Sequence, residues 1–208
     1  MKFVAISDTH GMHQQVLLPK GDVLLHSGDV SNIGRLNGVV DFLQWFSKQD
    51  FEYKVFIAGN HDFYFERASE QDVLELIPDN VIYLNDSGVT INGINIWGSP
   101  MSPRFGNWAF NRDRGEDIDQ HWQLIPENTD ILLTHGPPHG ILDLTYSNLN
   151  VGCEMLLERL RTVQPKYSIF GHIHEAAGQM RKNNIHYINA SVVNLRYQVV
   201  HLPTIFEM

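Results

Sequence analysis

Short apolar runs that end abruptly in polar residues recur along this chain, and each predicts a buried β-strand. One such run, Val55–Ala58, is followed by Gly59 and then by the polar triplet Asn-His-Asp at 60–62. A glycine after a strand lets the chain turn sharply or lets a ligand approach the backbone closely. Four other runs share this pattern, at 3–7, 23–26, 130–134 and 167–170. We therefore predict five strands that present polar side chains at their carboxyl ends.

Apolar residues at helical spacing lie between these strands and predict helices at 38–49, 68–77, 116–125 and 153–163. Three further strands are predicted at 81–84, 89–91 and 94–98. The last two flank Asn92-Gly93, a strong hairpin signal. The segment from about 186 to 206 predicts antiparallel strands that complete a sheet. This order of elements predicts an α/β fold, with residues 1–208 forming one domain.

The composition adds that the protein should be globular and able to attract cations. With 43% apolar residues, the 208-residue chain can bury a substantial core. It has 15 Lys and Arg against 24 Asp and Glu, a formal charge of -9, which argues against extended nucleic-acid binding. The single cysteine, Cys153, excludes an internal disulfide and indicates a reducing compartment. It lies in an apolar helical pattern, so we expect it in the core. No apolar run suits a membrane span or a signal peptide, so we expect a cytoplasmic protein without a membrane partner.

The polar residues at the five strand ends could bind metal. Because ligands bind at the carboxyl edge of α/β sheets, we expect these side chains to converge there. One tetrahedral ion takes only about four ligands. Seven candidates are available, so we expect two ions bridged by a carboxylate, about 3.5–4 Å apart. The nitrogen and oxygen donors suit Mn, Fe, Ni, Co or Zn better than Ca and do not choose among these metals. The candidates are Asp8, His10, Asp29, Asn60, His135, His172 and His174.

The tripeptide Gly-Asp-Val occurs twice, and only one copy has the right position. Asp22 precedes the strand at 23–26, whereas Asp29 follows it. Because the binding edge of a parallel sheet is the carboxyl edge, Asp29 is the candidate ligand. We expect Asp22 to be a turn residue at the opposite end of the strand.

Taken together, five motifs resemble the signature of the calcineurin-like metallophosphoesterase superfamily: Asp-x-His at 8–10, Gly-Asp at 28–29, Gly-Asn-His-Asp at 59–62, His-Gly at 135–136 and Gly-His-x-His at 171–174. The resemblance implies a four-layer α/β/β/α sandwich of two mixed sheets, with a dinuclear metal site at one sheet edge. It implies that Asp29 bridges the two ions. It also implies that one ion is held by Asp8, His10 and His174 and the other by Asn60, His135 and His172.

A narrower resemblance concerns the segments 98–111, 134–138 and 171–175, which are similar to the MPPED-type metallophosphoesterase-domain proteins. This group implies a phosphodiesterase that acts on a small phosphate ester, with nucleotides among the candidate substrates. His139 departs from the group, in which an apolar residue usually follows the two prolines, so substrate specificity near His139 is open. Trp108 and Phe110 lie in a long loop rich in Pro, Gly and aromatic residues, and loops of this length are often functional. We expect one of the two rings to contact the substrate; the alternative is that both anchor the loop in the core.

The expected chemistry is attack on phosphorus by a metal-bridging hydroxide. The leaving oxygen then needs a proton, and His61 is the candidate general acid. Asp62 could orient the His61 ring or raise its pKa. The alternative is that His61 is only a structural neighbour of Asn60.

Two other functions compete with a phosphodiesterase. A protein or small-molecule phosphomonoesterase is the first, but protein phosphatases of the superfamily have Arg where this chain has Ala58. They also follow Gly-Asp with Val-Asp-Arg-Gly, whereas residues 30–33 here are Val-Ser-Asn-Ile. A non-enzymatic binding module is the second, but such proteins typically lose ligand histidines, and none is missing here. The natural substrate, the metals and the oligomeric state stay open.

Overall fold

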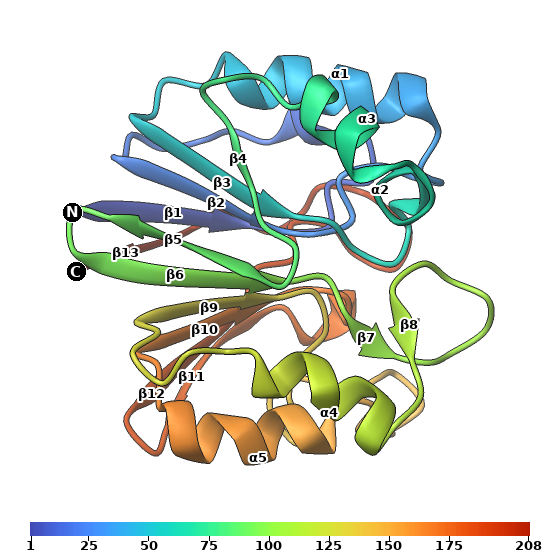
Figure 1. The fold of residues 1–208 in the computed structure, drawn as a ribbon, viewed down its shortest axis with the longest axis vertical. Coiled ribbons are helices and arrows are strands. Elements are labelled where there is room, and N and C mark those ends of the chain that lie inside the picture. Colours follow the sequence, from blue (N-terminus) through green and yellow to red (C-terminus); the bar gives the residue numbers. More distant parts are fainter.

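The computed structural model describes residues 1–208 as two stacked sheets enclosed by two layers of helices (Figure 1). The first sheet has the order β13-β1-β2-β3-β4, with bounds Thr204–Glu207, Lys2–Ile6, Val23–Ser27, Tyr53–Ile57 and Ile82–Tyr83. The second has the order β11-β12-β10-β9-β6-β5, with bounds Gly178–Lys182, Ile185–Asn189, Tyr167–Phe170, Ile131–Thr134, Ile94–Ser99 and Ser87–Ile91. Both sheets mix parallel and antiparallel pairs. The predicted sandwich of two mixed sheets is confirmed.

Helices cover the outer face of each sheet (Figure 1). The first sheet is covered by α1 (Leu36–Ser47), α2 (Phe63–Arg67) and α3 (Glu70–Leu76). The second is covered by α4 (Glu116–Gln123) and α5 (Glu154–Val163). The sequence did not predict α2, because five residues are too few for a helical period to appear. No helix has the length and apolar character needed to cross a membrane.

The central strands β1, β2, β3, β9 and β10 are buried on both faces, which explains their almost continuous apolar runs. In β1, Phe3 and Ala5 belong to the core between the sheets, together with Ile131 and Ile169 of the second sheet. The alternate residues Val4 and Ile6 belong to the core beneath the helices. The period of two along a strand produces this division. The two cores hold both sheets in a defined position relative to each other.

The C-terminal segment differs from the sequence prediction. An unpredicted strand, β11, forms a hairpin with β12 through Asn183 and Asn184, both of which have positive φ. That hairpin turn reverses the chain, so β12 runs parallel to β10. The prediction of antiparallel strands over 186–206 therefore holds for the pairing of β12 with β11 but not for its pairing with β10. It holds for β13, which crosses to the first sheet and pairs antiparallel with β1.

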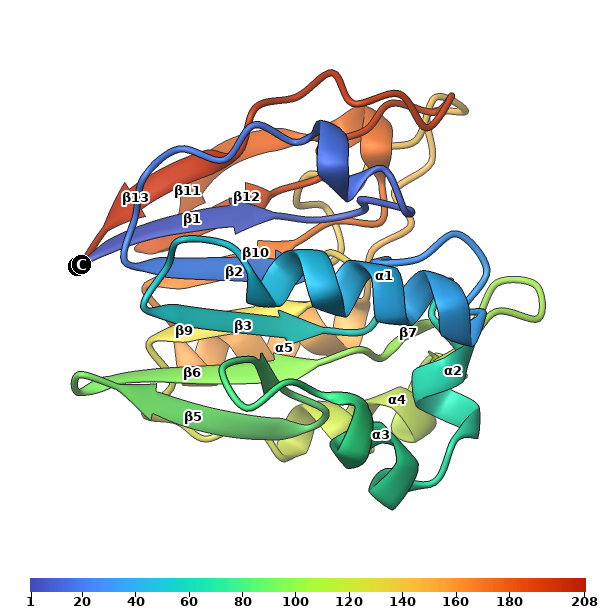
Figure 2. The same cartoon turned by 90° about the horizontal axis from the view of Figure 1, so that it is seen from above.

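The five strands expected to end in polar residues all end at the same edge of the sandwich (Figure 2). In the first sheet, β1, β2 and β3 are parallel neighbours. In the second, β9 and β10 are parallel neighbours. A short pair within the long loop, β7 (Ser102–Pro103) with β8 (Asn111–Arg112), lies beside this edge. Asp22 lies at the opposite end of its strand and accepts the Lys2 backbone N–H at 2.7 Å, as predicted.

Candidate metal centre

Three of the five strand ends turn the chain through left-handed backbone conformations. Four ligand candidates have positive φ although none is glycine: Asp8 (56°), His10 (43°), Asp29 (55°) and His172 (69°). Such conformations are uncommon outside glycine, although Asp and His tolerate them better than most residues. Each costs about 1–3 kcal/mol and persists only where the surrounding structure enforces it, often at functional sites. The sheet edge is therefore shaped by turns that stability alone would not favour.

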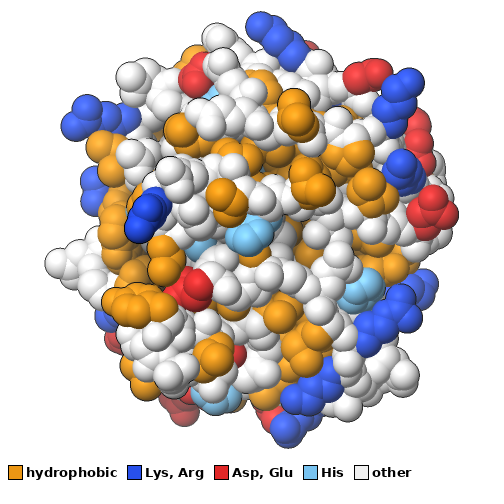
Figure 3. All heavy atoms as spheres, turned by 180° about the vertical axis from the view of Figure 1, so that it is seen from behind, with side chains coloured by type: hydrophobic (Ala, Val, Ile, Leu, Met, Phe, Trp, Pro, Cys, Tyr) orange, Lys and Arg blue, Asp and Glu red, His pale blue; other side chains and the backbone are white.

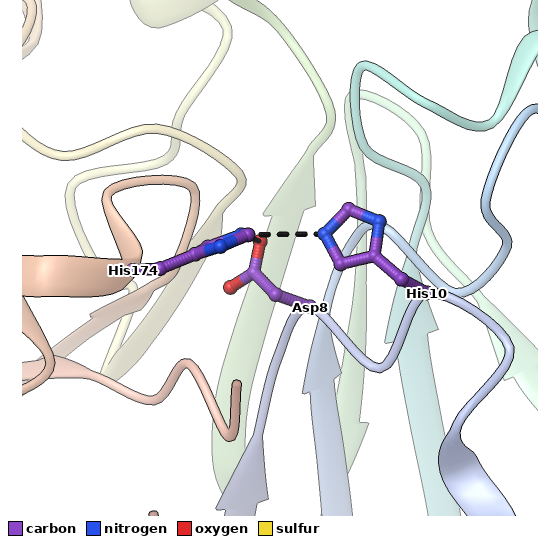
Figure 4. A group of neighbouring side chains, drawn as sticks. All are labelled: Asp8, His10 and His174. Atoms are coloured by element: carbon purple, nitrogen blue, oxygen red, sulfur yellow. Dashed lines mark hydrogen bonds and ion pairs between the residues drawn. The ribbon is translucent and has the colours of Figure 1, made fainter. Parts of the chain in front are cut away.

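One group of ligand candidates joins the ends of β1 and β10 (Figure 4). The Nε2 atoms of His10 and His174 lie 3.2 Å apart, and Asp8 Oδ1 is 3.5 Å from His174 Nε2. All three side chains are buried. The carboxylate of Asp8 also accepts the backbone N–H of His172 at 3.0 Å, which ties the two strand ends together.

Asp29 lies between this group and the remaining candidates. Its Oδ2 is 3.6 Å from His10 Nε2 and 3.4 Å from His135 Nε2. Asp29, His135 and His172 form a second group whose ligand atoms all lie within 4.8 Å of one another. Asn60 Oδ1 is 2.7 Å from His135 Nε2, so Asn60 adjoins the second group. The structure thus brings all seven predicted ligands together, with Asp29 shared between the two halves.

These residues fit divalent cations. The facing Nε2 atoms of His10 and His174 are buried beside the carboxylates of Asp8 and Asp29. Buried polar atoms are normally paired, so this crowding of nitrogen and oxygen atoms is better satisfied by a cation than by the protein alone. His135 Nδ1 donates to the Ser27 carbonyl at 3.0 Å, which leaves Nε2 facing the centre as a metal-binding histidine requires.

Without metal, each buried carboxylate stabilises a neighbouring protonated histidine. Burial alone would lower the pKa of His135, yet the Asp29 carboxylate raises it to about 9. Burial would raise the pKa of Asp29, yet His135 holds it well below its usual range. Asp8 and His174 behave in the same way. Burial would raise the pKa of Asp8, but His174 lowers it, and burial would lower the pKa of His174, but Asp8 raises it. Metal ions bind neutral imidazole, so they would displace these protons.

Two glycines allow the strand ends to approach so closely. A methyl group on Gly171 would overlap the Asp8 carboxylate and the Ser7 side chain. A methyl group on Gly59 would overlap Asp29 and the ring of His135. The glycines in Gly-His-x-His and Gly-Asn-His-Asp are therefore required by the space that the ligands occupy.

His61 and Asp62 have different neighbours from those expected. The His61 ring is half-buried beside the centre, and its Nδ1 donates to the Asn32 carbonyl at 2.6 Å. The Asp62 carboxylate instead accepts hydrogen bonds from the backbone N–H groups of Val30, Ser31 and Gly59 and from the Ser31 hydroxyl, at 2.7–3.0 Å. The prediction that Asp62 orients the His61 ring is wrong, because the Asn32 carbonyl holds the ring and Asp62 joins two loops.

A cavity of about 420 Å³ opens over the metal-ligand candidates. Trp108 lines this cavity, which agrees with the expectation that one of the two loop rings contacts the substrate. Phe110 is only 3% exposed and belongs to the core, so its assignment as a substrate contact is wrong. His139 is absent from the lining and lies 3.9 Å from both Asp143 and Glu154. Its assignment as a substrate contact stays a prediction, because the neighbouring Gly136 and Pro137 line the cavity but His139 does not.

Sequence reasoning missed one prominent wall of the cavity. Tyr197 lines it, and the ring stands edge-on to His10 with 4.7 Å between ring centroids. Its φ of 57° is unusual for an aromatic residue. Tyr197 belongs to no motif and lies far along the chain in the loop before β13. Only the tertiary fold brings this loop to the centre, where Val192 donates to the Ser7 carbonyl at 3.1 Å.

The fold and the metal-ligand cluster are those of a metal-dependent phosphoesterase. Residues 1–176 match the model of the calcineurin-like phosphoesterase family, and the chain belongs to that family. The resemblance inferred from the five motifs is thereby confirmed.

Relatives extend this similarity over the whole chain. Metallophosphoesterase domain-containing protein 1 of Homo sapiens is 40% identical, over 100% of this chain and 71% of that protein. The Mus musculus protein of the same name matches with the same values. One solved structure superposes with a TM-score of 0.65 at 14% identity, covering 90% of this chain and 89% of that one. This last likeness concerns the fold alone.

Proposed function

We propose that the protein is a phosphodiesterase with two metal ions that hydrolyses a small phosphate ester, with nucleotide esters among the candidates. The observation that supports it most is the position of Asp29 between two ligand groups directly beneath a cavity. The first ion would be held by Asp8, His10 and His174, and the second by Asn60, His135 and His172. The two ions would supply an activated water molecule and offset the phosphate charge.

In this proposal, His61 provides the proton that the leaving group needs. A backbone carbonyl can only accept, so the contact with Asn32 makes Nδ1 the donor and leaves Nε2 at the other end of the ring. We assign to Nε2–H of the protonated ring the transfer to the leaving oxygen as the phosphorus–oxygen bond breaks. The water oxygen becomes part of the phosphate product, and the alcohol leaves neutral.

The charges around the cavity favour a diester over a monoester. Two arginines line it, but Arg104 is paired with Asp113 and Arg114 with Glu154. A monoester carries about two negative charges at neutral pH and a diester one, so a cavity whose two arginines are both paired suits the diester better. Ala58 likewise supplies no cation where protein phosphatases have Arg.

The size and charge of the surface favour a small substrate over a nucleic acid. A cavity of about 420 Å³ is within the range of small-ligand sites. On the face of the molecule shown in Figure 3, most Lys and Arg side chains lie near the outline of the molecule, while apolar side chains spread over the middle of that face. With a formal charge of -9, the chain offers no general attraction to a phosphate backbone.

The test is hydrolysis of bis-p-nitrophenyl phosphate and of p-nitrophenyl phosphate after chelation and reloading with Mn, Fe, Ni, Co or Zn. We expect metal-dependent activity with a higher kcat/KM for the diester. Asp29→Asn should abolish it, whereas Asp22→Asn should not. This second variant is a matched control, because Asp22 belongs to the other Gly-Asp-Val copy at the opposite sheet edge. Higher kcat/KM for the monoester would make the protein a phosphomonoesterase, and no activity with any metal would indicate a binding module.

A further inference from the structure

The indole of Trp108 covers one face of the His61 imidazole. The ring centroids are 4.2 Å apart and the planes differ by 25°, a stacked arrangement. The ring of His10 stands edge-on to His61 at 4.6 Å. With Nδ1 bonded to the Asn32 carbonyl, the imidazole is held on one face and on one edge. These contacts restrict rotation about both side-chain torsions of His61.

The loop that carries Trp108 is fastened to the segment that carries His61. Ala109 donates its backbone N–H to the Asn60 carbonyl at 3.0 Å. Phe110 donates its backbone N–H to Glu66 Oε1 at 2.7 Å and buries its ring in the core. Trp108 therefore directly precedes two residues that are fixed to the 60–66 segment. The indole follows His61 as part of one unit, although it comes from a long loop.

We propose that Trp108 is a positioning residue that holds His61 in the orientation from which Nε2 donates its proton. The proposal rests on the proposed phosphodiester hydrolysis with His61 as the acid. Proton transfer needs the donor within about 3 Å of the leaving oxygen, and misplacement by about 1 Å can cost about 100-fold in rate. The indole face that contacts His61 cannot also stack on a substrate base. This differs from the expectation that Trp108 acts chiefly by substrate stacking.

The kinetic test compares Trp108→Ala and Trp108→Phe, each in the wild-type and in the His61→Asn background, with phosphodiesters of graded leaving-group pKa. We expect Trp108→Ala to lower kcat about tenfold or more for alkoxide leaving groups, a share of the 10²–10⁴-fold due to a general acid. The loss should be small for p-nitrophenolate, which leaves without a proton, and KM should change little. Trp108→Phe should restore most of the rate. In the His61→Asn background, Trp108→Ala should cause no further loss.

Trp45→Ala is the matched control, because Trp45 also lies against a histidine, His13, but lines no part of the cavity. It should leave the dependence on the leaving group unchanged. The proposal is overturned if Trp108→Ala mainly raises KM, or if its loss of rate persists in the His61→Asn background. Either result would make Trp108 a substrate contact.

A second measurement tests the position of His61 without any activity. In the zinc-loaded protein, the Nδ1 proton of His61 should be visible by NMR in slow exchange, with its assignment given by its absence in His61→Asn. It should be lost in Trp108→Ala and retained in Trp108→Phe. An unchanged signal in Trp108→Ala overturns the proposal. Failure of the proposed function is distinguishable, because it would appear as a wild-type protein inactive with every metal while this signal still responds to Trp108.

Discussion

At the scale of single residues, Asn60 and His61 are adjacent but would serve different parts of the proposed reaction. The amide of Asn60 is buried against His135 among the ligands. The ring of His61 is half-buried at the cavity, bonded through Nδ1 to a backbone carbonyl and stacked on an indole. Loss of either side chain should lower activity, but for different physical reasons that kinetics can separate.

Asn60→Ala should lose metal, and excess metal should restore part of its activity. His61→Asn should keep both ions and lose about 10²–10⁴-fold in kcat for a poor, alkoxide leaving group, since that is the usual contribution of a general acid. The deficit should shrink for p-nitrophenolate. The measurement is kcat against leaving-group pKa with the bound metal counted. A His61→Asn protein that loses metal, or loses the same factor with every leaving group, would show that His61 is not the acid.

The pKa of His135 makes metal binding depend on pH. In the metal-free protein, burial opposes and Asp29 favours the protonated ring, whose pKa is about 9. At pH 7 the ring carries a proton that a metal ion must displace, so binding should release protons and tighten as pH rises towards 9. Titration calorimetry in buffers of different ionisation enthalpy measures this release. Metal uptake without proton release at pH 7 would contradict the assignment.

The same pKa predicts how the metal-free protein responds to pH. A folded-state pKa above the unfolded value of about 6.5 stabilises the fold fully below pH 6.5, and this contribution is lost as pH rises through about 9. The free energy of unfolding of the metal-free protein should therefore fall between pH 6.5 and 9. Denaturant titrations across this range measure it. The zinc-loaded protein is the control, because its His135 is already neutral, and it should show a smaller fall.

At the scale of elements, Asp62 joins the loop after β2 to the loop after β3. Its carboxylate accepts four hydrogen bonds from Val30, Ser31 and Gly59. Burial and the Asp29 charge raise the pKa of Asp62 to about 6, against the effect of these hydrogen bonds. Asp29 and Asn60 lie on the two joined loops, so this contact sets the spacing between them.

Asp62→Asn should destabilise the protein and weaken metal binding. An amide NH₂ in place of Oδ2 would face the N–H groups of Val30 and Gly59, and each unpaired buried donor costs about 1–3 kcal/mol. Thermal unfolding and metal titration would measure the two effects. Asp22→Asn is the control, because Asp22 also accepts a backbone N–H, but at the far edge. A normal melting temperature with a changed leaving-group dependence would instead return Asp62 to the role of orienting His61.

At the scale of the whole molecule, the centre joins the two sheets. Asp8, His10, Asp29 and Asn60 follow strands of the first sheet, whereas His135, His172 and His174 follow strands of the second. An ion bound by both sets is a cross-link that only the folded protein can form. It should therefore stabilise the fold by mass action.

Removal of metal should lower the melting temperature measurably. A ligand present at 100 times its Kd stabilises by about 2.7 kcal/mol, which for a chain of this size corresponds to about 5–10 °C. Calorimetry before and after chelation, and after reloading, would measure it. Asp29→Asn should melt at a temperature that chelation no longer changes. An unchanged melting temperature in a wild-type protein shown to be free of metal would contradict a structural role for the ions.

The sequence by itself determined where most strands lie and which residues are the metal-ligand candidates. Apolar runs that end in glycine and polar residues placed the strands and all seven ligand candidates, because burial on both faces imposes a pattern that reads directly from the sequence. The motif spacing was sufficient to indicate the family. The two Gly-Asp-Val copies could be told apart, because a residue before a strand and a residue after it lie at opposite edges of the sheet.

Only the tertiary structure decided which groups contact one another across the centre. The partners of Asp62, the parallel direction of β12, the burial of Phe110 and the approach of Tyr197 to His10 all depend on loops meeting from distant parts of the chain. The stack of Trp108 on His61 has the same origin, since it joins residues 47 positions apart through the packing of a loop. Sequence periodicity describes which side of its own element a residue faces, but the partner on that side is set by how the layers and loops pack.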